Sequence, residues 1–333
     1  MGHVPRTLFF PLDGSDMSRG IAEWTATPRF SNGYGDARHL ATVLVENHSL
    51  KPYDQRVLGT YVFLETALRA LASHGDELRR ASVTDRDRRV EEIPLAWEIL
   101  RQTPPEQESF LGIEQRLVPS DLSGGLRVEW TGRPVTLELP VFSGSEPTFP
   151  ARRPRAYWIP PTWPEVIERL AWHGIEMERL AEPRKVAVEI YRLADPEFAS
   201  TPFEGHVRVS AAAISEQRTV VYPAGSVRVT TDQALGTLAV LLLEPESPDS
   251  FFQWGFFHEV FQRTEYAESY VLEPLAESLL EGSPELADEF RGKLLEDAEL
   301  AGDPRERLDW FYRQTPFFDE RWGLYPVARE LPE

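Results

Sequence analysis

The residues of this sequence best placed to do chemistry are a glutamate and a histidine that follow a short apolar run. Glu46 comes directly after residues 40–45, "LATVLV", and His48 lies two positions later. Such a run is typical of a strand covered on both faces of a mainly parallel sheet, and open α/β sheets bind ligands at the carboxyl ends of their strands. A partly desolvated carboxylate at that position can act as a general base.

Each of these residues also has a purely structural interpretation. Glu46 can cap a loop amide or pair with Lys51 or Arg56, and His48, which an extended chain places on the same side as Glu46, can be a hydrogen-bonding loop residue. Tyr34 lies between two glycines in "SNGYG", which suits either a mobile phenol that faces a substrate or an ordinary turn tyrosine.

Two His-x-x-Glu patterns have the spacing of a zinc-ligand pair. In the first, His74 and Glu77 fall near the end of a surface helix; in the second, Gly174 ends a helix between His173 and Glu176. We expect neither to bind zinc. Cysteine is absent, so a metal would need His, Asp or Glu ligands, and no phosphate-binding glycine loop or nucleophile elbow is found.

Composition limits the partners that this chain can have. A formal net charge of −19 repels phosphate backbones and anionic lipid, so we expect no nucleic-acid or membrane-surface binding. The longest apolar stretch, residues 235–245, is about half of the ~20 residues that a membrane span needs. The first residues do not read as a secretory signal, and the compartment stays open.

The pattern of the remaining sequence predicts an α/β protein of two or three units, since 333 residues exceed the usual size of one core. Helical spacing begins at Asp54 and continues for about five turns, whereas short alternating segments at 126–132 and 135–142 indicate antiparallel strands. The charge run at 79–92 and the proline-rich residues 147–155 suggest boundaries. We therefore expect units at 1–81, 82–150 and 151–333.

The third unit is expected to combine strand, helix and strand. Thr162 and Glu165 match a capping box, Pro164 suits the first helical turn, and Gly174 suits the end of that helix. Further strands are predicted at 186–193, 205–214, 226–231 and 238–243. Beyond Asp249 the chain is predicted to be helical, with capped helix starts at Ser283 and Asp303.

Residues 27–57, "TPRFSNGYGDARHLATVLVENHSLKPYDQRV", resemble the last part of the catalytic domain in bacterial zinc metallocarboxypeptidases of the carboxypeptidase A type. Residues 157–180, 222–257 and 265–280 are similar to a carboxyl-terminal extension of a bacterial branch of that family. The resemblance implies a mixed-sheet αβα remnant followed by a β-rich extension and terminal helices. It assigns Glu46 as general base and acid, with Tyr34, Arg38 and His48 as candidate substrate-binding residues.

The sequence departs from this family in one respect that bears on activity. The family's zinc ligands, a His-x-x-Glu pair and a later histidine, precede its catalytic glutamate by many tens of residues. Only His3 and His39 precede Glu46 here. We therefore expect Zn²⁺ in a complete enzyme but no bound metal in this chain, which alone should be inactive. Family members are commonly secreted or periplasmic.

Two functions follow from these patterns. The first is the carboxyl-terminal portion of a zinc carboxypeptidase that hydrolyses carboxyl-terminal residues from peptides. The second is a non-catalytic binding or assembly module built on a carboxypeptidase remnant. In both, the strand before Glu46 lacks its sheet neighbours, so we expect an exposed edge that binds the metal-binding half of the enzyme or a second copy of the chain.

Overall fold

The computed structural model describes residues 6–49, 51–101, 104–263 and 266–332, and its helices and mixed sheets confirm the α/β class. Its strands are β1 (Phe9–Pro11), β2 (Ile21–Glu23), β3 (Glu92–Ile99), β4 (Glu106–Pro119), β5 (Leu126–Phe142), β6 (Ser145–Arg152), β7 (Ala156–Ile159), β8 (Glu178–Arg179), β9 (Arg184–Phe198), β10 (Val209–Tyr222), β11 (Val227–Thr230) and β12 (Ala328–Glu330). Its helices are η1 (Met17–Arg19), α1 (Ser31–Ala37), α2 (Tyr53–Asp87), α3 (Pro164–Trp172), α4 (Gly236–Leu243), η2 (His258–Phe261), α5 (Ser269–Gly282), α6 (Pro284–Glu296), α7 (Ala298–Gly302) and α8 (Pro304–Tyr312).

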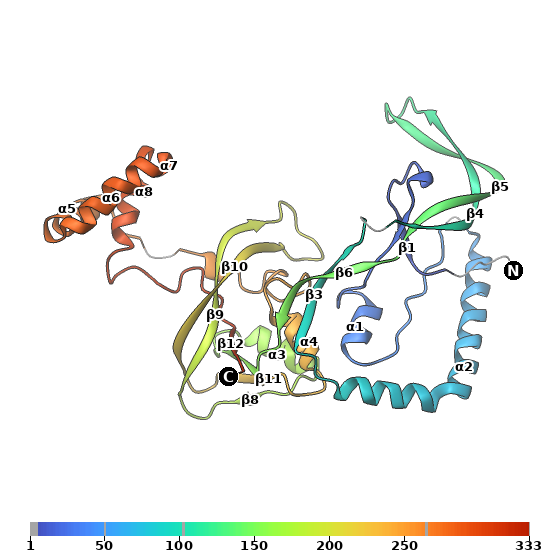
Figure 1. Cartoon of the computed structure of the whole chain (residues 1–333), viewed down its shortest axis with the longest axis horizontal. Coiled ribbons are helices and arrows are strands. Elements are labelled where there is room, and N and C mark those ends of the chain that lie inside the picture. The colour runs from blue at the N-terminus through green and yellow to red at the C-terminus, as the bar shows by residue number, and fades with distance from the viewer. Residues whose placement is uncertain (1–5, 50, 102–103, 264–265, 333) are drawn as a thin grey trace.

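The strands form three sheets with the orders β1-β2-β5-β4, β10-β9-β12-β7-β11-β8 and β3-β6. The two antiparallel segments predicted at 126–142 are one long strand, β5, which pairs with β4 in a ribbon that projects from the molecule (Figure 1). Among the strands that the structure describes, β2 and β5 alone pair in parallel, and the pairs of the six-stranded sheet are antiparallel. The predicted strand at 186–193 is confirmed as part of β9, and residues 209–214 of the strand predicted at 205–214 are confirmed as part of β10, whereas residues 205–208 precede it.

The largest core lies where β7 and β11 meet α3 and α4. All four residues of β7 are buried, and Leu170 of α3 is fully enclosed. Residues 238–243 belong to helix α4, so the predicted strand there is wrong. A short run that is apolar on all sides gives no period by which a buried helix and a buried strand can be distinguished. Here the side chains of α4 are covered all round by the core.

Helix α3 begins one residue later than the capping-box prediction requires. Pro164 occupies its first turn as predicted, but Trp163 is the N-cap residue and makes no side-chain cap, so the capping box of Thr162 is wrong. The proline fixes φ at the first helical position, which sets the start of the helix. Gly174 follows the helix with φ of +82°, in the left-handed region, and confirms the predicted end.

We call the six-stranded sheet, together with α3 and α4, the six-stranded unit. A polar network lies inside its core, centred on Glu244 directly after α4. The side chain of Glu244 is 1% exposed and accepts hydrogen bonds from the hydroxyls of Tyr157 at 2.5 Å and Tyr191 at 3.2 Å. Arg329 of β12 places its Nε 3.3 Å from Glu244 Oε1 and its Nη1 3.2 Å from Glu189 Oε2. Burial raises the pKa of Glu244, and the positive charge of Arg329 opposes that rise.

Helix α2 extends the predicted helix to 35 residues and has no buried residue. It lies bent at one side of the molecule (Figure 1). Its apolar side chains face solvent, with Tyr61 64% and Leu68 67% exposed. A surface helix of this kind normally buries one apolar stripe against a neighbour. α2 therefore presents an apolar surface to which no described segment is packed.

Helices α5 to α8 form a separate cluster that projects from the opposite side of the six-stranded unit (Figure 1). Ser283 accepts a hydrogen bond from the N–H of Leu286, and Asp303 accepts from the N–H groups of Arg305 and Glu306. Both predicted helix starts are thus confirmed. The aromatic residues between Asp249 and η2 form turns rather than the predicted helix, and Phe251, Phe252 and Phe257 of these turns are buried in the core.

The proposed division into units remains a prediction. α2 runs through the first proposed boundary and ends at Asp87, within the charge run, while β6 ends at Arg152 near the second. Among the described residues, no helix has both the length and the apolar character needed to cross a bilayer.

Candidate functional site

The apolar run before Glu46 is not a strand, so that prediction is wrong for this structure. Residues 40–45 are irregular, and Val43 is 67% exposed. A strand needs a neighbour to take up its backbone N–H and C=O groups. In the described part of the chain, no strand pairs with this run. The residue types that favour a buried strand are therefore present without the sheet that would bury them.

Glu46 follows this run as an exposed residue. Within the described ranges its side chain makes no ion pair or hydrogen bond, so pairing with Lys51 or Arg56 is not found. The neighbouring Asn47 donates to the hydroxyl of Thr60 at 3.0 Å and attaches the segment to α2. His48 is also exposed. No hydrogen bond, ion pair or ring contact between described residues joins Glu46 to Tyr34 or Arg38.

Tyr34 and Arg38 do lie together, and they contact the third predicted unit. The Tyr34 hydroxyl is 2.7 Å from Nδ1 of His173, the residue that ends α3. Arg38 Nη1 donates to the same hydroxyl at 3.0 Å, and the Arg38 guanidinium lies 5.5 Å from the centre of the Tyr34 ring. The pKa of His173 is lowered by burial and by the charges of Arg38 and Arg169. His173 carries a contact that the sequence pattern did not reveal.

The glycines beside Tyr34 allow close packing rather than the mobility that their spacing first indicates. A Cβ on Gly33 would lie 2.2 Å from the carbonyl oxygen of Thr27, and one on Gly35 would lie 2.0 Å from the hydroxyl of Thr42. Both glycines are buried in α1. The predicted turn is a short helix, α1, which contains Tyr34.

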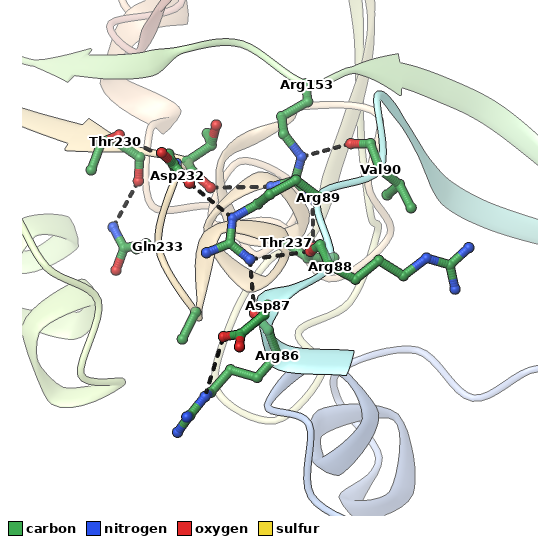
Figure 2. A network of polar contacts seen from close by, with 12 residues as sticks. Arg86, Asp87, Arg88, Arg89, Val90, Arg153, Thr230, Asp232, Gln233 and Thr237 are labelled. Atoms are coloured by element: carbon green, nitrogen blue, oxygen red, sulfur yellow. Dashed lines mark hydrogen bonds and ion pairs between the residues drawn. The ribbon is translucent and has the colours of Figure 1, made fainter. Parts of the chain in front are cut away.

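A second set of contacts attaches the end of α2 to the six-stranded unit. His39 Nδ1 is 2.6 Å from Asp85 of α2, and its Nε2 is 2.9 Å from the carbonyl oxygen of Ala234. Figure 2 shows the adjoining arginines, in which Arg89 Nε donates to Asp232 at 3.1 Å and Arg153 donates to the carbonyl oxygen of Val90 at 2.7 Å. We call the contacts of these residues the α2 junction.

Arg153 is the central residue of the α2 junction. It also donates to the carbonyl oxygen of Thr231 at 3.2 Å. A further hydrogen bond goes to the hydroxyl of Thr237 at 2.8 Å (Figure 2). Burial, with the charge of Arg89 nearby, lowers the pKa of the Arg153 guanidinium. Val90 lies just before β3, Thr231 follows β11 and Thr237 is in α4, so one side chain connects segments that are far apart in the chain.

Replacing Arg153 with leucine should lower the free energy of unfolding by about 2 kcal/mol, because part-buried acceptors lose their donor. Urea titration followed by tryptophan fluorescence measures the loss. Arg152→Leu, one position away and exposed, is the control and should change the value by less than about 0.5 kcal/mol. Equal effects of the two substitutions would mean that the junction contacts do not carry this stability.

Neither His-x-x-Glu pattern belongs to a metal site in this structure. His74 Nδ1 is 3.4 Å from Glu77 on the exposed face of α2, and the backbone N–H of Glu176 donates to Gln233. Across the described residues, no three His, Cys, Asp or Glu side chains are grouped so that they could hold a metal ion. The residues that the structure describes therefore do not form the zinc centre that the family resemblance implies.

Comparisons with known proteins show a relationship over part of the chain. No family model and no solved structure matches the chain. It is 35% identical over 111 residues, 33% of its length, to carboxypeptidase 2 of Trichophyton rubrum, and 37% identical over 103 residues to carboxypeptidase 2 of Trichophyton tonsurans. A probable carboxypeptidase 2 of Arthroderma benhamiae is 34% identical over 97 residues.

These matches cover 21%, 19% and 18% of the respective fungal proteins, so the chain spans about a fifth of the length of the curated relatives it matches. In each case the matched part is also only about a third of this chain. Over that third, the chain is related to proteins named as carboxypeptidases.

Proposed function

We propose that this chain is the carboxyl-terminal portion of a zinc-dependent metallocarboxypeptidase of the carboxypeptidase A type, from the bacterial branch that carries an extension. The complete enzyme hydrolyses carboxyl-terminal residues from peptides. The relationship to proteins named carboxypeptidase 2 supports the reaction class. The family resemblance of residues 27–57 supports the role of Glu46.

The observation that carries this proposal is that residues 40–46 are exposed although their composition favours a buried strand. An apolar run of strand composition ends in a carboxylate, yet the run is exposed and the carboxylate is unpaired within the described ranges. Beside it, α2 leaves Tyr61 and Leu68 facing solvent. Apolar surface of this extent is typical of a binding interface. We assign its occupant as the part of the catalytic domain whose strands flank residues 40–45.

In this proposal the zinc ligands belong to that same part of the enzyme, because the ligands of the family that residues 27–57 resemble precede its catalytic glutamate. In the assembled site, Glu46 takes a proton from the attacking water and returns it to the amine that leaves. The added strands would bury Glu46 and partly desolvate it, which is the environment in which a carboxylate serves as a general base. The isolated chain should therefore be inactive.

The proposal is tested by co-expressing the chain with the polypeptide encoded directly upstream of Met1. The purified assembly should retain stoichiometric zinc and release carboxyl-terminal residues from blocked dipeptides, as followed by mass spectrometry. The 333-residue chain purified alone should do neither. Stoichiometric zinc on the isolated chain, or an assembly that is inert and free of metal, would overturn the proposal, and the second result would favour a binding or assembly module.

A further inference from the structure

His39 makes two side-chain contacts in the α2 junction, and both partners are hydrogen-bond acceptors. Its Nδ1 is 2.6 Å from Oδ2 of Asp85, and its Nε2 is 2.9 Å from the carbonyl oxygen of Ala234. An ionised carboxylate and a backbone carbonyl have no hydrogen to donate. Both ring nitrogens must therefore carry a hydrogen, which is the case only in the imidazolium form of histidine.

We propose that His39 is a pH-sensitive switch, which holds the end of α2 against the six-stranded unit when its ring is protonated and releases it when the ring is neutral. The segments that meet at this side chain are far apart in the chain. His39 follows α1, Asp85 lies in the last turn of α2, and Ala234 lies between β11 and α4. We call these two contacts the His39 switch.

The end of α1 fixes the position of the His39 ring. The His39 N–H donates to the carbonyl oxygen of Asp36 at 3.0 Å, and its φ of +59° lies in the left-handed region in which many helices end. The side chain of His39 is 11% exposed, whereas that of Asp85 is 55% exposed. Water has little access to the ring, so it does not readily replace a lost partner.

The position of Asp85 in α2 gives it a need for a nearby cation. It lies two positions before Asp87, where the helix ends. The carbonyl end of a helix carries a partial negative charge, so a carboxylate there is unfavourable unless a positive group lies beside it. The His39 imidazolium supplies that charge. Because α2 buries none of its residues, polar contacts such as this one carry more of its attachment.

The other charged side chains on the elements around His39 have contacts of their own. Arg88, after α2, points away from Arg153 and Asp232 (Figure 2). His173 is a second titratable group near α1, which it contacts through Tyr34. The remaining groups are Arg86 with Asp87 at the end of α2, Arg89 with Asp232 after β11, Arg153 with the carbonyl oxygens of Val90 and Thr231, and Arg38 with the Tyr34 hydroxyl.

Loss of one proton from His39 removes one particular contact. The neutral ring keeps its hydrogen on Nδ1, because the charged carboxylate of Asp85 is the stronger acceptor. The lone pair of Nε2 then faces the carbonyl oxygen of Ala234, and the two acceptors repel each other. The protonated ring favours the attached state, so the attachment is complete at acid pH and is lost as the pH rises.

The protonation state is tested by ¹⁵N NMR of the histidine-labelled 333-residue chain at pH 5.5 and pH 8.5. The spectrum of His39→Gln identifies the His39 resonances. Both nitrogens of His39 should give imidazolium shifts at pH 5.5, and the ring should be the Nδ1–H tautomer at pH 8.5. A neutral ring at pH 5.5, or an Nε2–H tautomer at pH 8.5, would contradict the proposal.

Release of α2 is tested by the distance between two spin labels. The chain has no cysteine, so Arg80→Cys on α2 and Glu182→Cys between β8 and β9, both exposed, accept the labels selectively. Pulsed EPR should give one narrow distance distribution at pH 5.5 and a distribution at least about twofold broader at pH 8.5. Labels at Glu168→Cys of α3 and Glu182→Cys should give the same distribution at both pH values. A distance between α2 and Glu182 that does not respond to pH would overturn the switch.

Substitutions at the two contacts separate the His39 switch from other titrations. Asp85→Asn introduces an amide that can donate to Nδ1 of a neutral ring, which leaves Nε2–H for Ala234. This variant should therefore keep the narrow distribution at pH 8.5. His39→Gln cannot donate to both acceptors and should give the broad distribution at both pH values.

Glu77→Gln is the matched control, because it changes an exposed pair of α2 in which the carboxylate lies 3.4 Å from His74. It should respond to pH as the unsubstituted chain does. If Asp85→Asn still broadens at pH 8.5, or if His39→Gln remains narrow at pH 5.5, another group controls the attachment of α2 and the proposal fails.

Discussion

Replacing Glu244 with alanine should lower the free energy of unfolding by about 3–5 kcal/mol, because the substitution removes the more deeply buried of the two carboxylates, Glu244 and Glu189, beside the buried Arg329 guanidinium. Arg329 Nε would lose its partner at 3.3 Å, and the hydroxyls of Tyr157 and Tyr191 would lose their acceptor. Each of these groups lies in the core, where water cannot replace the lost contact without opening the sheet. Chemical denaturation followed by circular dichroism measures the difference.

A matched control separates the loss of this network from the loss of a surface charge. Glu178→Ala removes a carboxylate of β8 that pairs with Arg184 at 2.9 Å, with both side chains about half exposed. Such exposed pairs contribute about 0–1 kcal/mol. If Glu244→Ala were no more destabilising than Glu178→Ala, the buried network would not hold the six-stranded unit together.

Glu46→Gln should lower kcat of the zinc-loaded assembly about 10²–10⁴-fold, the range that a positioned general base supplies. The amide is nearly the same size as the carboxylate but cannot take a proton from water. KM should change little, because the proposed role of Glu46 is proton transfer rather than substrate binding. Steady-state hydrolysis of blocked dipeptides gives both constants.

Glu65→Gln is the control for this substitution, since Glu65 is an exposed glutamate of α2 that pairs with Arg69 at 2.7 Å. It should leave kcat within about twofold. The zinc content of all variants should be equal, which shows that the assembly has formed. An active assembly whose kcat is unchanged by Glu46→Gln would remove Glu46 from the mechanism, and with it the argument from residues 40–46.

The sequence correctly predicted those features of the fold that depend on residues close to one another in the chain. The caps at Ser283 and Asp303, the glycine after α3 and the start of α2 all depend on residues within a few positions of one another. The strand predicted at 40–45 failed for the opposite reason. Its residue types favour a strand, but a strand exists only where a neighbour supplies the hydrogen bonds.

The contacts that tie distant segments together were not visible in the pattern. His173 was considered only as part of a His-x-x-Glu motif, and its contact with Tyr34 depends on how α1 packs against α3. Glu244 follows an apolar run that read as a strand, and its partners come from β7, β9 and β12. Such pairs are set by tertiary packing, which periodicity and spacing do not encode.

Amide hydrogen exchange of residues 40–46 tests the central claim most directly. In the isolated chain the amides of residues 41–46 should exchange rapidly, because no described strand pairs with them, whereas the Leu40 amide donates to the carbonyl oxygen of Gly35 and is left out of the comparison. In the active, zinc-loaded assembly their exchange should slow at least about 100-fold as the run becomes a central strand that ends at Glu46. Protection already present in the isolated chain, or rapid exchange that persists in an active assembly, would contradict the account.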